Sequence, residues 1–248
     1  MRTQKAEPNT LENRQILDRM STTRFVGVVA ITYAASVVLQ NAMFFGGVAK
    51  LLGLGDGTDA PTYSDPLSQV LAYHTANQGA VSVAAGLEAS NMVLLLLFVT
   101  GLQGLVQRRG AAGADWSRLA VAAGATLSAL FAIVIATHIA VVLAAQGLTE
   151  PTPTFELIWQ FHAAVFALAL PALGTTFIGA ALATHASGLT RSWQRLLGIA
   201  GGSLLCLASA GSLAIADGSP LLFAGVLGLA LWLVWLVATG LRLIRRQV

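Results

Sequence analysis

Long apolar stretches separated by short polar turns dominate the chain. Inside lipid, only a helix or a closed barrel satisfies its own backbone, and a helix needs about 20 apolar residues to cross about 30 Å of hydrocarbon. None of the stretches shows the ten-residue alternation that is typical of a barrel strand. We therefore predict an all-α membrane bundle of six transmembrane helices at residues 24–52, 79–107, 117–148, 156–185, 193–216 and 219–244.

The polar segments define the remaining organisation. Residues 1–23 are polar and form a predicted cytoplasmic N-terminal segment, and residues 24–246 form one transmembrane domain. Turn-forming Gly, Pro and Asp residues separate the spans. The longest connection, at residues 53–78, is the only one long enough to fold over a face of the bundle.

Basic residues predict how the bundle is oriented, because Lys and Arg near the ends of spans stay on the cytoplasmic side. With the N-terminus inside, every arginine and Lys5 lie inside, and only Lys50 lies outside. Both termini are therefore predicted to be cytoplasmic, and the 53–78 segment becomes an outer loop. The predicted location is the inner membrane of a bacterium, with the lipid bilayer as the main partner.

Composition excludes several classes of protein. Hydrophobic residues make up 56% of the chain and charged residues 10%, whereas a soluble domain needs about a quarter of its residues charged. The same composition excludes a disordered chain, and the single Cys206 cannot close a disulfide within the chain. The net charge of +3 comes from residues at span ends, so no nucleic-acid partner is implied.

Polar residues inside the predicted spans are the strongest functional signal. An ionisable side chain in hydrocarbon costs about 2.5 to 3.5 kcal/mol even on an insertion scale, so each one is a candidate for function. Glu88, His138, His162 and Asn41 lie 20, 20, 23 and 17 residues from the cytoplasmic anchors of their spans, which are Arg108, Arg118, His185 and Arg24. At about 1.5 Å per residue, these positions share one layer about 25 to 35 Å from the inner anchors. The shared depth predicts a polar pocket in the outer leaflet.

The second span adds a polar track to this pocket. Positions 74, 78 and 88 recur on one face of a continuous helix. If the helix runs unbroken through Gly79, then His74 and Gln78 lead from the outer surface to Glu88. The candidate pocket therefore consists of Glu88, His138, His162, Asn41, His74 and Gln78.

Two imidazoles and a carboxylate form a ligand set that suits zinc or iron, so Glu88, His138 and His162 are the candidate metal ligands. A haem between His138 and His162 is a related candidate, because bis-histidine ligation needs only two facing helices. No metal-binding motif such as His-Glu-x-x-His supports either one.

Other functions also fit the same polar layer. The pocket is predicted to bind a metal ion, or a small amphipathic molecule that has an apolar body and a polar head. A structural or accessory scaffold would use the layer only as hydrogen bonds between helices, and proton-coupled transport would use its titratable groups. No reaction is predicted, because the chain has no catalytic motif.

The chain also resembles a known family in its later spans. The relevant residues are the sequence Phe-His-Ala-Ala-Val-Phe at 161–166, Trp-Gln-Arg-Leu-Leu-Gly at 193–198, and Leu-Trp-Leu-Val-Trp at 231–235 before a basic tail. In these features the chain looks like bacterial six-helix membrane proteins of a family of unknown function that is common in actinobacteria. The resemblance implies a six-helix inner-membrane bundle and carries no activity with it.

Overall fold

The computed structural model describes residues 10–45, 47–56 and 58–245, and all regular structure in these residues is helical. Residues 1–9 of the predicted N-terminal segment and residue 246 at the predicted end of the domain lie outside the described residues. The helices are α1 (Thr10–Phe44), α2 (Gly47–Leu51), α3 (Leu67–Ala76), α4 (Gln78–Arg108), α5 (Ala114–Ala145), α6 (Pro153–Ala186), α7 (Ser192–Ala210), α8 (Ser212–Ala216) and α9 (Leu222–Arg245).

The prediction of an all-helical bundle with membrane-competent helices is confirmed. Five helices are long and apolar enough to cross a membrane, which is compatible with an integral membrane protein in contact with lipid. They correspond to five of the six predicted spans and cover Thr22–Phe44, Gln78–Arg108, Ala114–Ala145, Pro153–Ala186 and Leu222–Arg245.

The predicted fifth span differs from the other five. Residues 193–216 form two helices, α7 and α8, which are interrupted at Gly211. Neither helix is among the five that length and composition qualify for crossing a membrane. The α7 sequence contains Gln194, Arg195 and several small residues, which lower its mean hydropathy below that of its neighbours.

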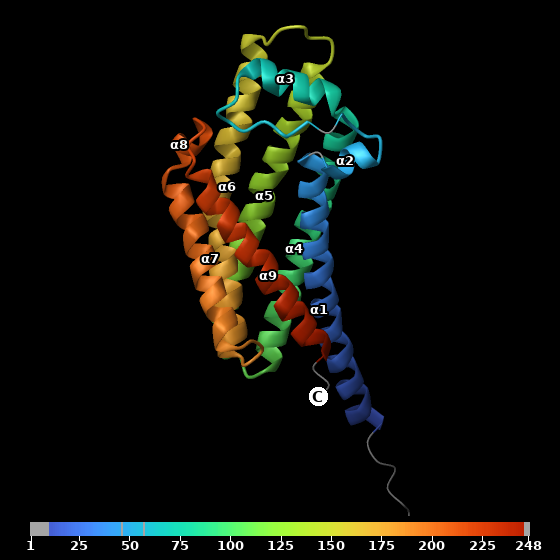
Figure 1. The fold of residues 1–248 in the computed structure, drawn as a ribbon. Helices are drawn as coiled ribbons and strands as arrows, with labels where there is room; N and C mark the ends of the chain where they lie inside the picture. The colour runs from blue at the N-terminus through green and yellow to red at the C-terminus, as the bar shows by residue number, and fades with distance from the viewer. Residues whose placement is uncertain (1–9, 46, 57, 246–248) are drawn as a thin grey trace, which may run out of the picture.

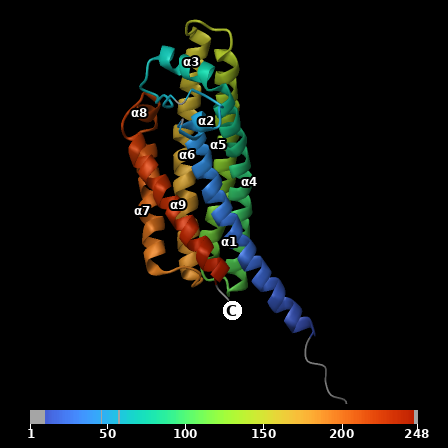
Figure 2. The same ribbon diagram turned by 45° about the vertical axis from the view of Figure 1, so that its right-hand side comes forward.

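The first predicted span also has different bounds. α1 begins at Thr10 and continues without a break through Arg24, so the boundary predicted at residues 23 and 24 is not a helix end. The helix ends at Phe44, and Gly47–Leu51 forms the separate short helix α2. Figure 2 shows the N-terminal part of α1 extending beyond the other long helices.

Six helices form a closed ring. In the order α1, α4, α5, α6, α7 and α9, each helix packs against the next, and α9 returns to pack against α1. Figure 1 shows α9 crossing the bundle obliquely, from α8 at one end to the N-terminal half of α1 at the other. α7 is thus a full member of the ring although its hydropathy is low.

Small residues bring α6, α7 and α9 together. A Cβ atom added to Gly174 of α6 would lie 2.6 Å from the Gly202 carbonyl oxygen of α7, and one added to Gly228 of α9 would lie 2.8 Å from the Gly201 carbonyl oxygen. Glycine lets the backbones approach this closely, which is how helices associate where lipid gives no hydrophobic drive. The stretch of α7 around these glycines is therefore clamped between α6 and α9.

Four aromatic rings fill the middle of the ring of helices. Trp232 and Trp235 of α9 stack with ring centroids 5.2 Å apart, and Phe177 of α6 lies 4.6 Å from Trp232. Phe98 of α4 packs edge-on against both tryptophans. All four side chains are fully buried, so the centre of the bundle is closed by aromatic packing.

Candidate functional site

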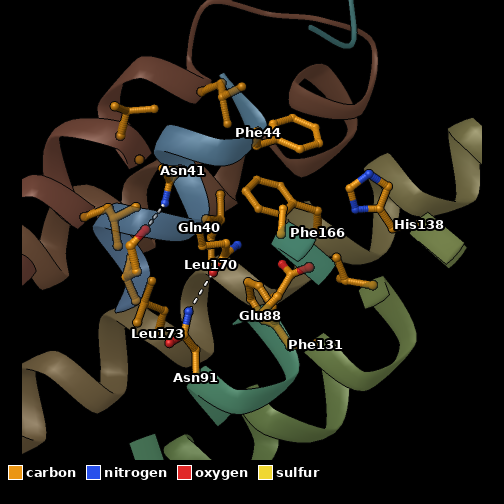
Figure 3. Close-up of a pocket in the computed structure, with 18 of the residues that line it drawn as sticks. Gln40, Asn41, Phe44, Glu88, Asn91, Phe131, His138, Phe166, Leu170 and Leu173 are labelled. Atoms are coloured by element: carbon orange, nitrogen blue, oxygen red, sulfur yellow. Dashed lines mark hydrogen bonds between the residues drawn. The ribbon is translucent and has the colours of Figure 1, made fainter. Parts of the chain in front are cut away.

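A cavity of about 310 Å³ lies between the aromatic centre and the segment that connects α2 to α4. α1, α4, α5, α6 and α9 form its walls, and residues 61–63 cover it. Figure 3 shows the side chains of several walls facing the same space. Most lining residues are apolar, as in small-molecule sites that bury a ligand's body.

Glu88 is the carboxylate of this cavity. It comes from α4 and is 8% exposed. Figure 3 shows its carboxyl group near Phe166, Phe131 and His138. Among the described residues, no side chain or backbone group forms a hydrogen bond or an ion pair with it. A buried carboxylate normally has such a partner, so Glu88 is an unpaired polar group of the cavity wall.

Three amides lie on the wall formed by α1 and α4. Asn91 of α4 donates a hydrogen bond from Nδ2 to Oε1 of Gln40 at 2.7 Å, and Asn41 donates from Nδ2 to the Val37 carbonyl at 2.8 Å. Asn91 is 1% exposed, and its Oδ1 has no partner among the described residues. Asn91 and Asn41 therefore use donors on the protein, whereas Gln40 uses its acceptor oxygen and keeps its amide N–H groups.

Two histidines and a tryptophan form another part of the lining. His138 of α5 and His162 of α6 have ring centroids 5.1 Å apart, and Trp159 stacks on His162 at 5.5 Å with the planes 15° apart. His162 Nδ1 lies 3.1 Å from the Thr137 hydroxyl and 3.2 Å from the Val134 carbonyl, and the tautomer that donates to this carbonyl has Nε2 as an acceptor. The Nε2 atom of His138 is buried without a partner among the described residues.

His74 of α3 packs against His138 and Trp159. Its ring centroid is 5.6 Å from that of His138 and 5.7 Å from that of Trp159. Its Nδ1 donates to the Val70 carbonyl at 2.7 Å. Burial lowers the pKa of His74 below its ordinary value of 6.5, although the Val70 hydrogen bond opposes this shift.

Residues 58–76, here named the roof segment, close the cavity. Tyr63 lies over Trp159, Phe166 and His162 with ring centroids 5.2, 6.1 and 6.2 Å away. Burial, and secondly the Glu88 carboxylate, raises the pKa of Tyr63 above its ordinary value of 10. The phenol therefore stays protonated at neutral pH and lies near the cavity carboxylate.

Hydrogen bonds hold both ends of the roof segment. Asn77, which is 1% exposed, donates from Nδ2 to Asp56 at 2.9 Å and to Thr58 at 3.0 Å, and its Oδ1 accepts from the Asp56 backbone N–H at 3.1 Å. Tyr73 donates from its hydroxyl to the Phe44 carbonyl of α1. Hydrogen bonds from the Thr58 backbone and side chain, and then from Asn77, lower the pKa of Asp56.

The predicted metal ligands do not form a metal site in this structure. No group of three or more His, Cys, Asp or Glu side chains in the described part of the chain is arranged to hold a metal ion. Glu88, His138 and His162 line one cavity, but they do not converge on one point. The zinc or iron site predicted from these residues therefore gains no support from the geometry.

The spacing of the two histidine rings does not support the haem prediction. Two imidazoles that bind an iron from opposite sides have ring centres about 6 Å apart or more, because each metal–nitrogen bond is about 2 Å long. The rings of His138 and His162 are 5.1 Å apart and inclined at 46°. As arranged here, they leave no space for an iron and its porphyrin between them.

The structure brings most of the predicted pocket residues together. Glu88, His138, His162 and Asn41 line the cavity, and His74 contacts His138. Gln78 does not join them, because the helix is interrupted at Asn77 and Gln78 is exposed. The continuous polar track from His74 through Gln78 to Glu88 is therefore wrong.

Sequence reasoning missed two polar residues of the cavity. Asn91 lies three residues after Glu88, on the same side of α4, and this spacing was the signal for it. Gln40 precedes Asn41 and bonds Asn91, which no pattern in the sequence indicates. Tyr63 was equally hidden, because its place over the cavity depends on how the roof segment folds back.

Comparison with known proteins finds no relative of this chain. No family model, curated protein or solved structure matches the chain.

Proposed function

We propose that this protein is a six-span membrane protein that holds a small amphipathic molecule in its cavity. The observation that supports this function is a mostly apolar cavity of about 310 Å³ with the partnerless Glu88 carboxyl facing it. The apolar body of a ligand lowers the free energy of the system when it leaves water and fills such a space. The polar head of the same ligand forms hydrogen bonds with the buried polar groups. The geometry therefore suits a molecule with one polar end.

The ring of helices supports α7 as the sixth span. α7 is 19 residues long and packs along both α6 and α9, so its polar residues have protein rather than lipid around them. Gln194, for example, is 1% exposed and donates to the Thr239 hydroxyl of α9 at 3.0 Å. A span shielded in this way needs less hydropathy than one that faces lipid.

The distribution of arginines supports cytoplasmic termini. Arg108, Arg118, Arg191 and Arg242 all lie near the helix ends at one end of the bundle, opposite the roof segment. Basic residues of this kind stay inside. In this orientation the cavity lies in the outer half of the membrane, and the roof segment faces the outside.

Labelling of cysteines tests this topology. After Cys206→Ala, the described chain has no cysteine, so single cysteines at Ser64 and at Arg109 report the two ends of the bundle. We expect a membrane-impermeant maleimide to label the Ser64→Cys variant in intact cells and the Arg109→Cys variant only after lysis. The reverse pattern would overturn the orientation.

The bacterial inner-membrane location and metal binding are also proposals. Arginine exceeds lysine by twelve to two, which fits a GC-rich bacterial genome and hence a bacterial inner membrane. The resemblance to actinobacterial six-helix membrane proteins agrees with this location. A metal ion held by Glu88, His138 and His162 is less well supported than an amphipathic molecule. Elemental analysis of the purified protein tests for such a metal.

A pure scaffold fits the cavity less well. Polar groups that serve only as bonds between helices pair with one another, as Asn91 and Gln40 do. Glu88 has no such partner among the described residues, and the space beside it is lined mainly by apolar side chains. Transport across the membrane is also less favoured, because Phe98, Phe177, Trp232 and Trp235 close the centre of the bundle.

Photoaffinity labelling in native membranes tests the binding function. Two diazirine-bearing phenylalkyl probes are used, one with a hydroxyl head and one with an amino head. We expect at least one probe to label residues of α1, α4 or α6 that line the cavity, and an excess of the probe without its diazirine to prevent this. Labelling confined to lipid-facing residues, or unaffected by the competitor, would contradict the proposed function.

A further inference from the structure

Several polar atoms of the cavity wall are acceptors to which no donor of the protein is bound. The Glu88 carboxyl has no donor bound to it among the described residues. Asn91 Oδ1 is buried without a partner. Nε2 of His162 is a further acceptor in the tautomer whose Nδ1 donates to the Val134 carbonyl.

Donors on the cavity wall do not reach the carboxyl. Among the described residues, Glu88 forms no hydrogen bond with any donor of the lining, including the amides of Gln40, Asn41 and Asn91 and the hydroxyls of Tyr33, Thr62 and Tyr63. No lysine or arginine is among the lining residues. The only ion pair in the described part of the chain joins Arg118 and Asp115 on the surface. The protein therefore supplies no cation for Glu88.

Aromatic rings surround the same carboxyl. Phe44, Phe131 and Phe166 line the cavity, and Figure 3 shows Phe131 and Phe166 beside Glu88, with Phe44 beyond Phe166. Tyr63 and Trp159 complete the wall on the side of the roof segment. The faces of aromatic rings attract cations, and a carboxylate enclosed by such rings is a favourable place for a positive charge that has left water.

From these features we infer that the polar head of the bound molecule is an organic ammonium group, held by the Glu88 carboxylate and the aromatic rings around it. This inference rests on the proposed function and names the class of its ligand. A primary or tertiary ammonium donates a charge-assisted hydrogen bond to Glu88 and leaves its apolar body in the remainder of the cavity. Two sources supply this chemistry, namely a free lipophilic amine and the ethanolamine head group of a lipid.

Binding of two matched probes tests the inference. The full-length protein in dodecyl maltoside micelles is titrated with 4-phenylbutylamine and with 4-phenylbutan-1-ol, which differ mainly in the charge of the head. We expect the amine to bind tighter by about tenfold or more, the effect of one charge-assisted hydrogen bond in a buried site. Glu88→Gln should remove this preference and leave the affinity for the alcohol nearly unchanged, whereas Glu88→Asp should retain part of it.

A matched control separates the site from net charge. Glu156 is an exposed carboxylate on α6 outside the cavity, so Glu156→Gln changes the charge equally and should preserve the preference for the amine. If the alcohol binds the wild-type protein as tightly as the amine, or if the preference survives Glu88→Gln, the inference is overturned while the proposed function stands. If neither probe binds the wild type, both are overturned.

A competition distinguishes the two sources. Short-chain phosphatidylethanolamine is added to the complex with 4-phenylbutylamine, and short-chain phosphatidylglycerol serves as the control lipid. Displacement by the ethanolamine lipid alone supports the inference with a lipid head group as the source. Retention of the amine against both lipids supports it with a free lipophilic amine. Displacement by both lipids equally shows a site that does not select a cation and overturns the inference.

Discussion

Gly27 of α1 and Gly240 of α9 touch backbone to backbone: a Cβ added to either one would lie 2.8 Å from the carbonyl oxygen of the other. This contact fixes the crossing of the two helices at the end of the bundle opposite the roof segment. Both helices line the cavity near their other ends. The close crossing at one end and the cavity at the other are therefore two consequences of the oblique path of α9.

Gly240→Leu should separate α1 from α9. The added side chain has no space against the Gly27 carbonyl, so the helices must move apart, at a cost of about 1 to 3 kcal/mol for overpacking. Thermal unfolding in detergent measures the effect. Gly86→Leu is the control, because Gly86 is exposed with no atom near the added Cβ. Equal unfolding temperatures for the two variants would show that the crossing does not depend on this contact.

Gly225→Leu should fill the cavity without unfolding the protein. Gly225 lies on the α9 wall, and a Cβ there would meet only ordinary contacts at 3.7 Å or more. The rest of the leucine side chain then occupies space that the ligand needs, so binding of the photoaffinity probes should fall about tenfold or more. The thermal unfolding temperature should stay close to that of the wild type. Unchanged probe labelling would place the ligand elsewhere.

Asn77→Ala should release the roof segment. The substitution removes the bonds that tie the exposed Asp56 and Thr58 to the buried Asn77, so this end of the roof segment should open more easily. Hydrogen exchange of residues 58–76 should accelerate, while exchange in the centre of α6 should not change. Gln78→Ala, at the exposed neighbouring position, is the control. Normal protection of the roof segment in Asn77→Ala would disprove its anchoring by this side chain.

Acidification should destabilise the bundle partly through His74. Its pKa is lowered in the folded protein, so between that value and 6.5 the unfolded chain binds more protons than the folded one. The stability contributed by neutral His74 is therefore complete above pH 6.5 and is lost as the pH falls through the lowered pKa. His138, Trp159 and Tyr73 pack around the ring and offer no carboxylate to hold its charge.

Comparison of the wild type with His74→Gln isolates this effect. Unfolding temperatures at pH 7.5 and pH 5 should differ less in the variant than in the wild type, because glutamine does not titrate. His185→Gln serves as the control, since His185 lies at the opposite end of α6 from His162. An identical pH dependence in the wild type and His74→Gln would assign the acid sensitivity to other groups.

The helices and the grouping of three polar residues could be predicted from the sequence because both depend on counting along one helix. Four predicted helices agree with the structure within a few residues at each end. Glu88, His138 and His162 share a cavity, in line with their similar distances from Arg108, Arg118 and His185. Hydropathy and the rise of 1.5 Å per residue carry this information directly.

Features that depend on contacts between distant segments could not be predicted in this way. The interruption at Asn77 turns His74 inward and Gln78 outward, and it arises from hydrogen bonds to Asp56 and Thr58, about twenty residues earlier. The low hydropathy of α7 likewise reflects burial of Gln194 against Thr239, which lies on α9. In both cases, tertiary contacts override the local pattern.

Native mass spectrometry of the protein extracted from its own membranes shows whether the cavity is occupied. We expect the wild type to carry a noncovalent small molecule, Gly225→Leu to lose most of it, and Gly86→Leu to retain it. A wild-type protein released from detergent without any such molecule, or equal retention by Gly225→Leu, would contradict the proposal that the cavity holds an amphipathic ligand.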